Sequence, residues 1–179
     1  MHNHRLQPRR VLAEGKFARL VAQDGWEWIE RVNASGAVVI VPITVDREIV
    51  FVEQYRIPLA RRVIELPAGL VGDVAGEEDE PLIAAARREL VEETGYDAAH
   101  WQAVAEGPSS AGLATEIYGI YLATEAVRVS AGGGDGTEDI DVHVVPLSEA
   151  VPWLLRKQQD GLMIDPKIYA GLYFASEVR

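Results

Sequence analysis

Three glutamates at helical spacing are the residues of this sequence best suited to chemistry. Glu92 and Glu93 follow Glu89 by three and four positions, so a helix would point all three carboxylates the same way. Two such charges about 4 Å apart repel by roughly 4 kcal/mol at an effective dielectric constant near 20, before screening. Hard divalent ions such as Mg²⁺ prefer carboxylate oxygens and commonly bridge to substrate phosphates. The spacing therefore suggests a phosphate-handling metal site.

The neighbours of the three glutamates favour this interpretation over the common alternative, a solvated acidic helix face. Arg88 lies four positions before Glu92, so an ion pair between them can orient one carboxylate. Gly95 follows directly and is expected to end the helix. The acids would then stand at the point where a helix meets a turn.

The segment resembles the signature of the Nudix hydrolases, which reads Gly, five residues, Glu, seven residues, Arg-Glu-apolar-x-Glu-Glu-x-Gly-apolar. Glu80 matches the first Glu, and the rest is matched by Arg88, Glu89, Leu90, Glu92, Glu93, Gly95 and Tyr96. Val74 stands where the opening Gly is expected. We take Gly69, in the Leu-Pro-Ala-Gly run at 66–69, as its counterpart, separated from Glu80 by an acidic insertion at 72–79.

The resemblance implies a role for each matched acid. Glu89 and Glu93 would be the principal metal ligands, and Glu92 a third ligand or a support. The backbone carbonyl of Ala68 would also bind metal, and Arg88 would belong to the catalytic group. Glu80 is expected to anchor the loop by hydrogen bonds. The implied ion is Mg²⁺, with Mn²⁺ as a substitute.

A further acidic candidate follows the Gly-rich run at 131–136. Residues 137–140, Thr-Glu-Asp-Ile, resemble a segment of ADP-ribose pyrophosphatases in which an acid on a mobile loop assists the attacking water. Glu138 is therefore the candidate base. The alternative is a solvent-exposed acid on a flexible loop.

Other segments resemble the ADP-ribose and nucleoside diphosphate sugar branch of the family. In Gln54-Tyr55-Arg56, the planar guanidinium of Arg56 would grip the diphosphate, unless it is an ordinary surface arginine. Trp26 or Trp28 is a candidate to stack on a nucleobase, although a core or interface Trp is the more common outcome. The expected substrate-binding residues are Arg56, Trp28, Glu65, Gly112 and Glu116.

One segment departs from this branch. ADP-ribose pyrophosphatases often carry Ser-Pro-Gly followed by an acid, whereas this chain has Ser-Ala-Gly at 110–112, with Glu116 as the following acid. Ala111 replaces the marker proline, which leaves the choice between ADP-ribose and another nucleoside diphosphate sugar open.

Apolar periodicity and turn residues predict the elements that position these residues. A hairpin is expected at 16–32, turning at Asp24-Gly25. Strands are expected at 37–43, 49–52, 63–66, 101–105, 117–123 and 140–145. Helices are expected from Pro81 through the glutamates, at 148–157 with Ser148 as cap, and at 165–176, opened by Asp165-Pro166.

This order is α+β. The resemblance implies a Nudix-like α/β/α sandwich with a mixed β-sheet, a signature loop–helix–loop and an N-terminal β-hairpin extension. We predict a strand extension at 1–36 and a Nudix hydrolase domain at 37–179. The N-terminal strands are too few for a core of their own, which favours a homodimer in which they are packed or exchanged.

Composition limits the partners. The 179-residue chain carries a net charge of −11, which disfavours nucleic acid and acidic membranes. A metal at the carboxylates would invert the local charge and admit a phosphate. No apolar run approaches the roughly 18 residues of a membrane span, and residues 1–10 do not resemble a secretory signal. With no cysteine present, a cytoplasmic location is expected.

The resulting hypothesis is a Mg²⁺-dependent pyrophosphohydrolase that splits a nucleoside diphosphate sugar, of the ADP-ribose or GDP-mannose type, into a nucleoside monophosphate and a sugar phosphate. Two alternatives remain open. The enzyme could act on a dinucleoside polyphosphate or a nucleoside triphosphate, or the chain could be a catalytically silent Nudix module that senses a nucleotide.

Overall fold

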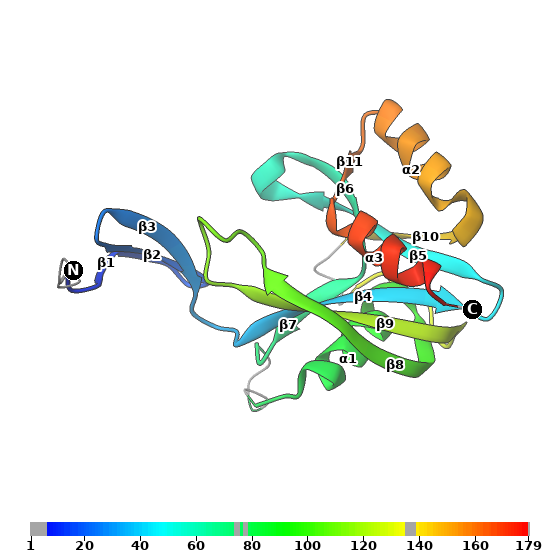
Figure 1. The fold of residues 1–179 in the computed structure, drawn as a ribbon, viewed down its shortest axis with the longest axis horizontal. Helices are drawn as coiled ribbons and strands as arrows, with labels where there is room; N and C mark the ends of the chain where they lie inside the picture. The colour runs from blue at the N-terminus through cyan, green and yellow to red at the C-terminus, as the bar shows by residue number, and fades with distance from the viewer. Residues whose placement is uncertain (1–6, 74–75, 77–78, 135–138, 179) are drawn as a thin grey trace.

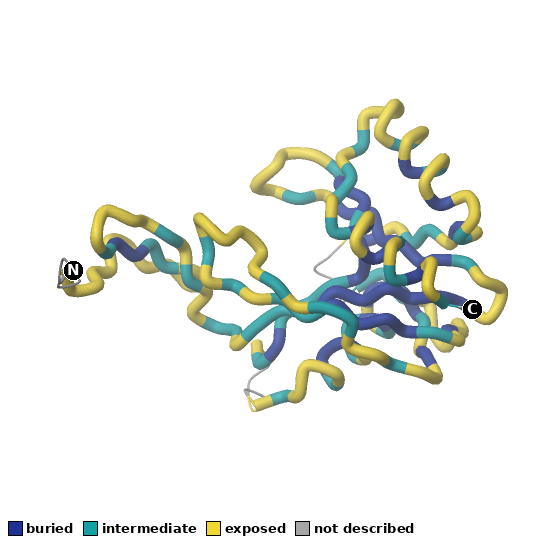
Figure 2. Tube along the Cα trace, in the orientation of Figure 1, coloured by how far each residue is buried: buried dark blue, intermediate teal, exposed yellow. Residues whose placement is uncertain are grey.

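The computed structural model describes residues 7–73, 76, 79–134 and 139–178. It has two parts: a three-stranded sheet at the N-terminus and a larger body built on an eight-stranded sheet. In Figure 1 the small sheet projects from the body on the side of the N-terminus. Figure 2 shows that buried residues gather in the central strands of the body, whereas the projection is mostly exposed.

The N-terminal sheet contains the predicted hairpin and one strand more. Strands β2 (Ala18–Gln23) and β3 (Trp26–Arg31) are antiparallel and are joined at Asp24 and Gly25. Both turn residues have positive φ, 51° and 81°, as a two-residue hairpin turn with right-handed strand twist requires. β1 (Arg10–Glu14) pairs with β2 and was not predicted, because all five of its residues are exposed and show no inward-facing alternation.

The large sheet is mixed, since β4 pairs in parallel with β9 and β11 with β6, while the other pairs are antiparallel. Its main path runs β11-β6-β5-β4-β9-β8, with β10 on β5 and β7 on β4. The strands are β4 (Gly36–Thr44), β5 (Glu48–Arg56), β6 (Arg61–Glu65), β7 (Ala68–Val71), β8 (Tyr96–Pro108), β9 (Ile117–Arg128), β10 (Ile140–Pro146) and β11 (Met163–Ile164).

Strands β4 and β5 diverge along their length, and this divergence shapes the body. Their register contact is Ile43 with Ile49, next to the turn that joins them. Further along, β7 pairs with β4 at Gly36–Val39, while β5 turns to β6 and β10. The sheet therefore opens at the end of β5 that carries Arg56.

Helices cover both faces of the large sheet. Helix α1 (Leu82–Thr94) packs on one face, and α2 (Ala150–Gln159) and α3 (Lys167–Ser176) pack on the other. Residues of β4 alternate between the two cores: Val38 and Ile40 face α1, whereas Val39 and Val41 face α2 and α3. The predicted α/β/α sandwich is confirmed.

Two helices begin at residues other than those predicted. Pro81 precedes α1 as its cap residue rather than opening it. Ser148 lies in a short 3-10 turn, Leu147–Glu149, so it does not cap α2. The opening of α3 is confirmed, because Asp165 Oδ1 accepts a hydrogen bond from Lys167 N–H at 2.8 Å. No helix in the described part of the chain is long and apolar enough to cross a membrane.

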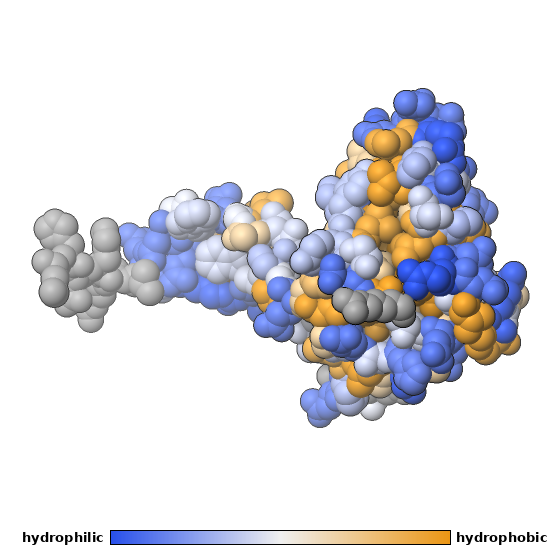
Figure 3. Space-filling view, turned by 45° about the vertical axis from the view of Figure 1, so that its right-hand side comes forward, coloured by the Kyte–Doolittle hydropathy of each residue, from blue (hydrophilic) through white to orange (hydrophobic). Residues whose placement is uncertain are grey.

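The surface differs between the two parts. On the face shown in Figure 3, apolar side chains gather over the body, whereas the projection is mostly hydrophilic or neutral. Exposed apolar residues nevertheless occur on the N-terminal strands and their ends, namely Val11, Leu12, Phe17, Trp26, Ile29 and Val32.

Candidate active site

The signature helix ends where the sequence predicted. Gly95 has a φ of 76° and donates its N–H to the Val91 carbonyl at 2.9 Å. A Cβ at Gly95 would stand 2.4 Å from the Ser130 carbonyl oxygen and 2.8 Å from Gly132 N. Position 95 therefore requires glycine for two reasons: its backbone is left-handed, and the chain that follows β9 passes too close for a side chain.

Arg88 is the centre of the signature. Its guanidinium bonds to Glu80 (3.2 Å), Glu89 (2.8 Å) and Glu92 (3.2 Å), and to the Leu70 carbonyl (3.3 Å). Burial alone would lower the pKa of Arg88, but its ion pairs with Glu80 and Glu89 outweigh burial and raise it. The predicted pair with Glu92 is present, and Glu80 anchors its own loop residue to α1 through Arg88, as expected.

Glu89 is held in an unfavourable electrostatic setting. Its side chain is 13% exposed and crosses Gly69 on β7 so closely that a Cβ there would lie 1.9 Å from Glu89 Cδ. Burial raises the pKa of Glu89 to about 7; Arg88 opposes this shift, while the neighbouring charges of Glu92 and Asp73 add to it. A cation beside this carboxylate would relieve both effects.

The other two glutamates have different partners. Glu93 is 3% exposed, and its Oε2 accepts a hydrogen bond from Ala68 N–H at 3.0 Å. The side chain of Glu92 is 45% exposed and pairs with Arg88. Within the described ranges, no three His, Asp or Glu side chains are grouped closely enough to hold a metal ion.

The chemistry of these side chains nevertheless fits a hard divalent ion, because they offer carboxylate oxygens, and the ionised form of one carboxylate is destabilised. Glu89 is that acid, since burial and like charges hold its pKa high.

A cleft of about 370 Å³ lies where β4 and β5 diverge. It brings together four of the predicted metal-binding, catalytic and substrate-binding residues: Arg56, Ala68, Glu89 and Glu116. Glu89 is the one member of the three-glutamate cluster that lines it. The rest of its wall consists of Arg31, Ala37, Val38, Val39, Gly69, Leu70, Asp73, Ser109, Tyr118 and Lys167.

Each cation of this cleft has a carboxylate partner. Arg56 pairs with Glu65 at 2.6 Å, and Arg31 pairs with Glu116 at 2.6 Å. Lys167 pairs with Asp165 and lies 5.8 Å from the centre of the Tyr118 ring. The sequence argument missed Arg31, Lys167 and Tyr118, because only the folded sheet brings β3, β9 and α3 to one place.

Trp28 and Gly112, both expected to bind substrate, lie outside this cleft. They line a second hollow of about 420 Å³ between β3 and the loop that joins β8 to β9. Trp28 donates its indole N–H to Glu30 at 2.9 Å, and Trp26 beside it is 66% exposed. Backbone bonds from Ile29 fix the loop to β3. Of the predicted substrate residues, Arg56 and Glu116 thus line the first cleft and Trp28 and Gly112 the second, while Glu65 lines neither and pairs with Arg56.

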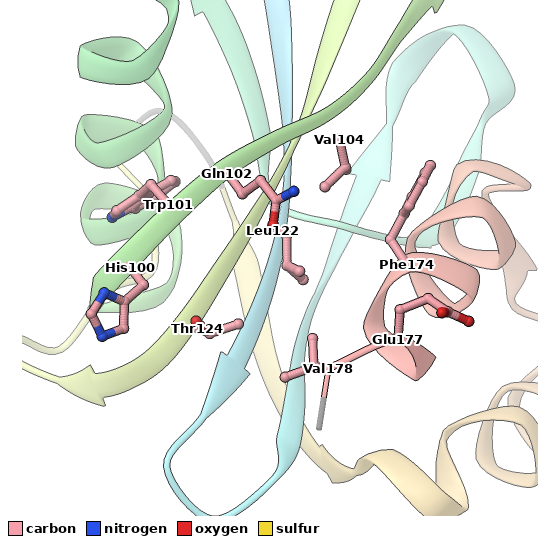
Figure 4. Close-up of a pocket in the computed structure, with 9 residues that line it drawn as sticks. All are labelled: His100, Trp101, Gln102, Val104, Leu122, Thr124, Phe174, Glu177 and Val178. Carbon is pink, nitrogen blue, oxygen red and sulfur yellow. The ribbon is translucent and has the colours of Figure 1, made fainter.

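A third hollow, of about 430 Å³, lies between the β8–β9 hairpin and the end of α3 (Figure 4). Gln102 of β8, Leu122 of β9 and Phe174 of α3 line this hollow. The Trp101 side chain extends toward α1, where Arg87 lies over its ring. It contains none of the residues singled out from the sequence. Glu138, the candidate base, lies outside the described residues.

The fold and the signature helix define a Nudix-type protein, and comparison with known proteins agrees. Residues 34–165 match the NUDIX domain model. The chain therefore belongs to the Nudix family, and the prediction of a Nudix hydrolase is confirmed. Nudix hydrolases generally use a divalent metal ion.

Three relatives within the family are similar to this chain over most of its length. A methanol dehydrogenase activator of Bacillus methanolicus is 36% identical over 130 residues, which are 72% of this chain and 68% of that protein. An ADP-ribose pyrophosphatase of Mycobacterium tuberculosis is 39% identical over 71% of this chain and 60% of that protein. A GDP-mannose pyrophosphatase of Cronobacter sakazakii is 33% identical over 75% and 70%. The resemblance to the nucleoside diphosphate sugar branch is confirmed, although the chain spans less than two thirds of the M. tuberculosis relative.

A solved structure described as an ADP compounds hydrolase superposes with a TM-score of 0.71, covering 96% of this chain and 91% of that one. At 19% sequence identity, this likeness supports the fold.

Proposed function

We propose that this chain is a Mg²⁺-dependent pyrophosphohydrolase of nucleoside diphosphate sugars, of the ADP-ribose or GDP-mannose type. Water would add across the diphosphate, giving a nucleoside monophosphate and a sugar phosphate. The observation that carries the proposal is one cleft whose wall holds the carboxylate of Glu89, with its pKa raised by burial, and the cations Arg31, Arg56 and Lys167. A bridging diphosphate needs both a metal-holding acid and positive side chains.

The residues of the cleft and of α1 would have different roles. Glu89, Glu93, Glu92 and the Ala68 carbonyl would hold Mg²⁺, which supplies polarisation of a phosphoryl oxygen and a lowered pKa of bound water. Arg56 would orient the diphosphate, since a guanidinium can contact two oxygens at once. Its present partner Glu65 keeps the guanidinium in place until an anion competes for it.

Three assignments beyond this cleft belong to the same proposal. Glu138 would hold the proton of the attacking water. Arg88 would keep Glu89 and Glu92 oriented, as its bonds to both carboxylates suggest. The hollow at Trp28 and Gly112 would receive the nucleobase, because an indole offers a large stacking surface.

We further propose a homodimer formed through residues 1–36, with 37–179 as the catalytic domain. The exposed apolar residues on the N-terminal strands support this arrangement. Sedimentation at micromolar concentration tests it, and a monomer would remove it. A cytoplasmic location and the absence of nucleic-acid or membrane partners complete the proposal.

A substrate panel with product identification tests the proposed activity. ADP-ribose, GDP-mannose, other nucleoside diphosphate sugars, diadenosine polyphosphates and nucleoside triphosphates are each incubated with Mg²⁺, with Mn²⁺, and with chelator. Sugar phosphate and nucleoside monophosphate as preferred products support the proposal. Inorganic pyrophosphate from triphosphates points to the first alternative. Tight binding of ADP-ribose without turnover in saturating Mg²⁺ points to a sensing module.

A further inference from the structure

One wall of the cleft combines a lysine with an aromatic ring. Lys167, the first residue of α3, and Tyr118 of β9 both line the cleft. The Lys167 ammonium lies 5.8 Å from the centre of the Tyr118 ring, and it also pairs with the Asp165 carboxylate. An ammonium with three hydrogen-bond donors therefore stands beside a large aromatic surface.

Asp165 fixes Lys167 through both the backbone and the side chain. Its Oδ1 accepts the Lys167 N–H at 2.8 Å, while its Oδ2 pairs with the ammonium. Asp165 is itself tied to the sheet, because its N–H donates to the Ile64 carbonyl at 2.9 Å. Its side chain is 13% exposed, so water and salt screen this pair less than a pair on the open surface. The ammonium is thus held beside the cleft.

These residues come from both sides of the opening between β4 and β5. Asp165 follows β11, which pairs with β6 on the β5 side of the sheet. Tyr118 is the register partner of Ala37 on β4, on the other side. The approach of Lys167 to Tyr118 therefore crosses the opening in which a substrate would lie.

This wall lies beyond the Arg31–Glu116 pair as seen from the Trp28 hollow. Residues 111–115 line that hollow, whereas Glu116 and Tyr118 line the cleft. An extended chain rises about 3.3 Å per residue, which carries Tyr118 about 7 Å past Glu116. A substrate with its nucleobase in the Trp28 hollow would therefore bring its other half toward Lys167 and Tyr118.

A sugar ring matches the chemistry of this wall. Neighbouring sugar hydroxyls can accept hydrogen bonds from one ammonium, and the apolar C–H face of the ring can pack on an aromatic side chain. Arg31 and Arg56 are better suited to the diphosphate, because a guanidinium can contact two of its oxygens at once. The cations of the cleft thus divide between two parts of the substrate.

We propose that Lys167 and Tyr118 form the subsite for the sugar half of the substrate, and that they determine the preference for a sugar ester of the diphosphate. This inference rests on the proposed function. The Lys167 ammonium donates to sugar hydroxyls, and the Tyr118 ring carries the C–H face. Asp165 is a positioning residue, since it holds the ammonium at the cleft.

The test compares two substrates that differ only in the sugar. One is the best nucleoside diphosphate sugar of the panel, and the other is the matching nucleoside diphosphate methyl ester, which has the same base, diphosphate and charge. Lys167→Met and Tyr118→Leu are each expected to lower kcat/KM about tenfold on the sugar substrate. On the methyl ester, each should lower it by no more than about threefold.

The variants are chosen to preserve the fold, and thermal unfolding checks them. Met keeps the apolar stem of Lys167, and the backbone bond to Asp165 Oδ1 does not depend on the side chain. Lys157→Met is the matched control, because Lys157 lies 5.3 Å from the centre of the Trp153 ring on α2, away from the cleft wall. It should keep the parental kcat/KM on both substrates.

Two kinetic outcomes overturn the inference. Equal losses on the two substrates would place Lys167 and Tyr118 at the diphosphate, and parental kinetics in folded variants would place them at neither part. Tyr118→Phe keeps the ring and should retain the preference for the sugar substrate. A loss of preference as large as that of Tyr118→Leu would contradict packing of the sugar on the ring.

Binding without turnover separates this inference from the proposed activity. The α,β-methylene analogues of the two substrates resist cleavage of the diphosphate and can be titrated calorimetrically in Mg²⁺. The parent should bind the sugar analogue about tenfold more tightly, and Lys167→Met should remove most of the difference. This preference in a parent that hydrolyses neither natural substrate would support the subsite and overturn the proposed hydrolase. Hydrolysis of both substrates with equal kcat/KM would overturn the subsite and leave the hydrolase standing.

Discussion

The α1 region and the N-terminal sheet differ in the sequence distance over which their contacts act. Arg88 reaches Glu89, Glu92 and Glu80 over one, four and eight positions. In the N-terminal sheet, Arg31 meets Glu116 across 85 positions. Local spacing thus arranges the acids, whereas the residues that we propose to face the substrate are arranged by the assembled fold.

The same two regions differ in burial. Glu89 and Glu93 are largely enclosed, whereas Trp26 and the ends of β3 are open. Changes around α1 should therefore affect the chemical step, and changes in the N-terminal sheet should affect substrate binding. The predictions below test this division, beginning with the largest effect.

Glu93→Gln is expected to lower kcat by at least about 100-fold and to weaken Mg²⁺ binding, because a neutral amide replaces a charged ligand. Folding should be preserved, since the amide oxygen can still accept the hydrogen bond from Ala68 N–H. Steady-state kinetics and calorimetric Mg²⁺ titration measure both effects. Glu149→Gln, an exposed acid beyond the cleft, is the matched control. Parental turnover by folded Glu93→Gln would contradict the proposed metal site.

Gly69→Ala is expected to reduce kcat by about 10- to 100-fold with a small change in stability. The new methyl would lie 1.9 Å from Glu89 Cδ, and the flexible end of that side chain can swing away. Folding thus survives, but the carboxylate leaves its position. Gly107→Ala is the control, since a Cβ there meets nothing within 4 Å. Equal kcat in the two variants would show that the position of Glu89 is unimportant.

Trp28→Ala is expected to raise KM about fivefold and to leave kcat within about twofold, as loss of a stacking surface predicts. Trp28→Phe keeps a ring but loses the N–H that donates to Glu30, so it should restore most of the binding. KM is measured with the best substrate of the panel. A lower kcat at unchanged KM would contradict the assignment of substrate binding to the N-terminal sheet.

Much of the α1 region was predictable because its determinants are adjacent in sequence. The Arg88–Glu92 spacing, the stop at Gly95 and the anchoring of Glu80 follow from helix geometry and turn chemistry. The strands of the body were also predictable, since β4 and β5 are continuous apolar runs buried on both faces.

What could not be predicted depends on distant contacts. The sequence placed three glutamates on one helix, but it did not show that Glu93 would bond to the Ala68 N–H or that Glu89 would cross Gly69 on β7. Nothing near Lys167 in the sequence shows that it joins a cleft with Arg56. The divergence of β4 from β5, which opens that cleft, is equally a property of the assembled sheet.

The smallest effect is expected from acid, and it should begin in the N-terminal sheet. A hydrogen bond from Arg9, opposed by burial and reinforced by Trp28 and Arg19, lowers the pKa of Glu30 to about 2. A group whose folded pKa is depressed stabilises the fold above its unfolded pKa, near 4.5, and loses that contribution as pH falls toward 2. The indole N–H resonance of Trp28 in the folded protein should therefore move around pH 2, where Glu30 is protonated, and Glu30→Gln should abolish this movement. If the resonance moves only when α1 unfolds, the two regions are one cooperative unit, and acid does not distinguish them.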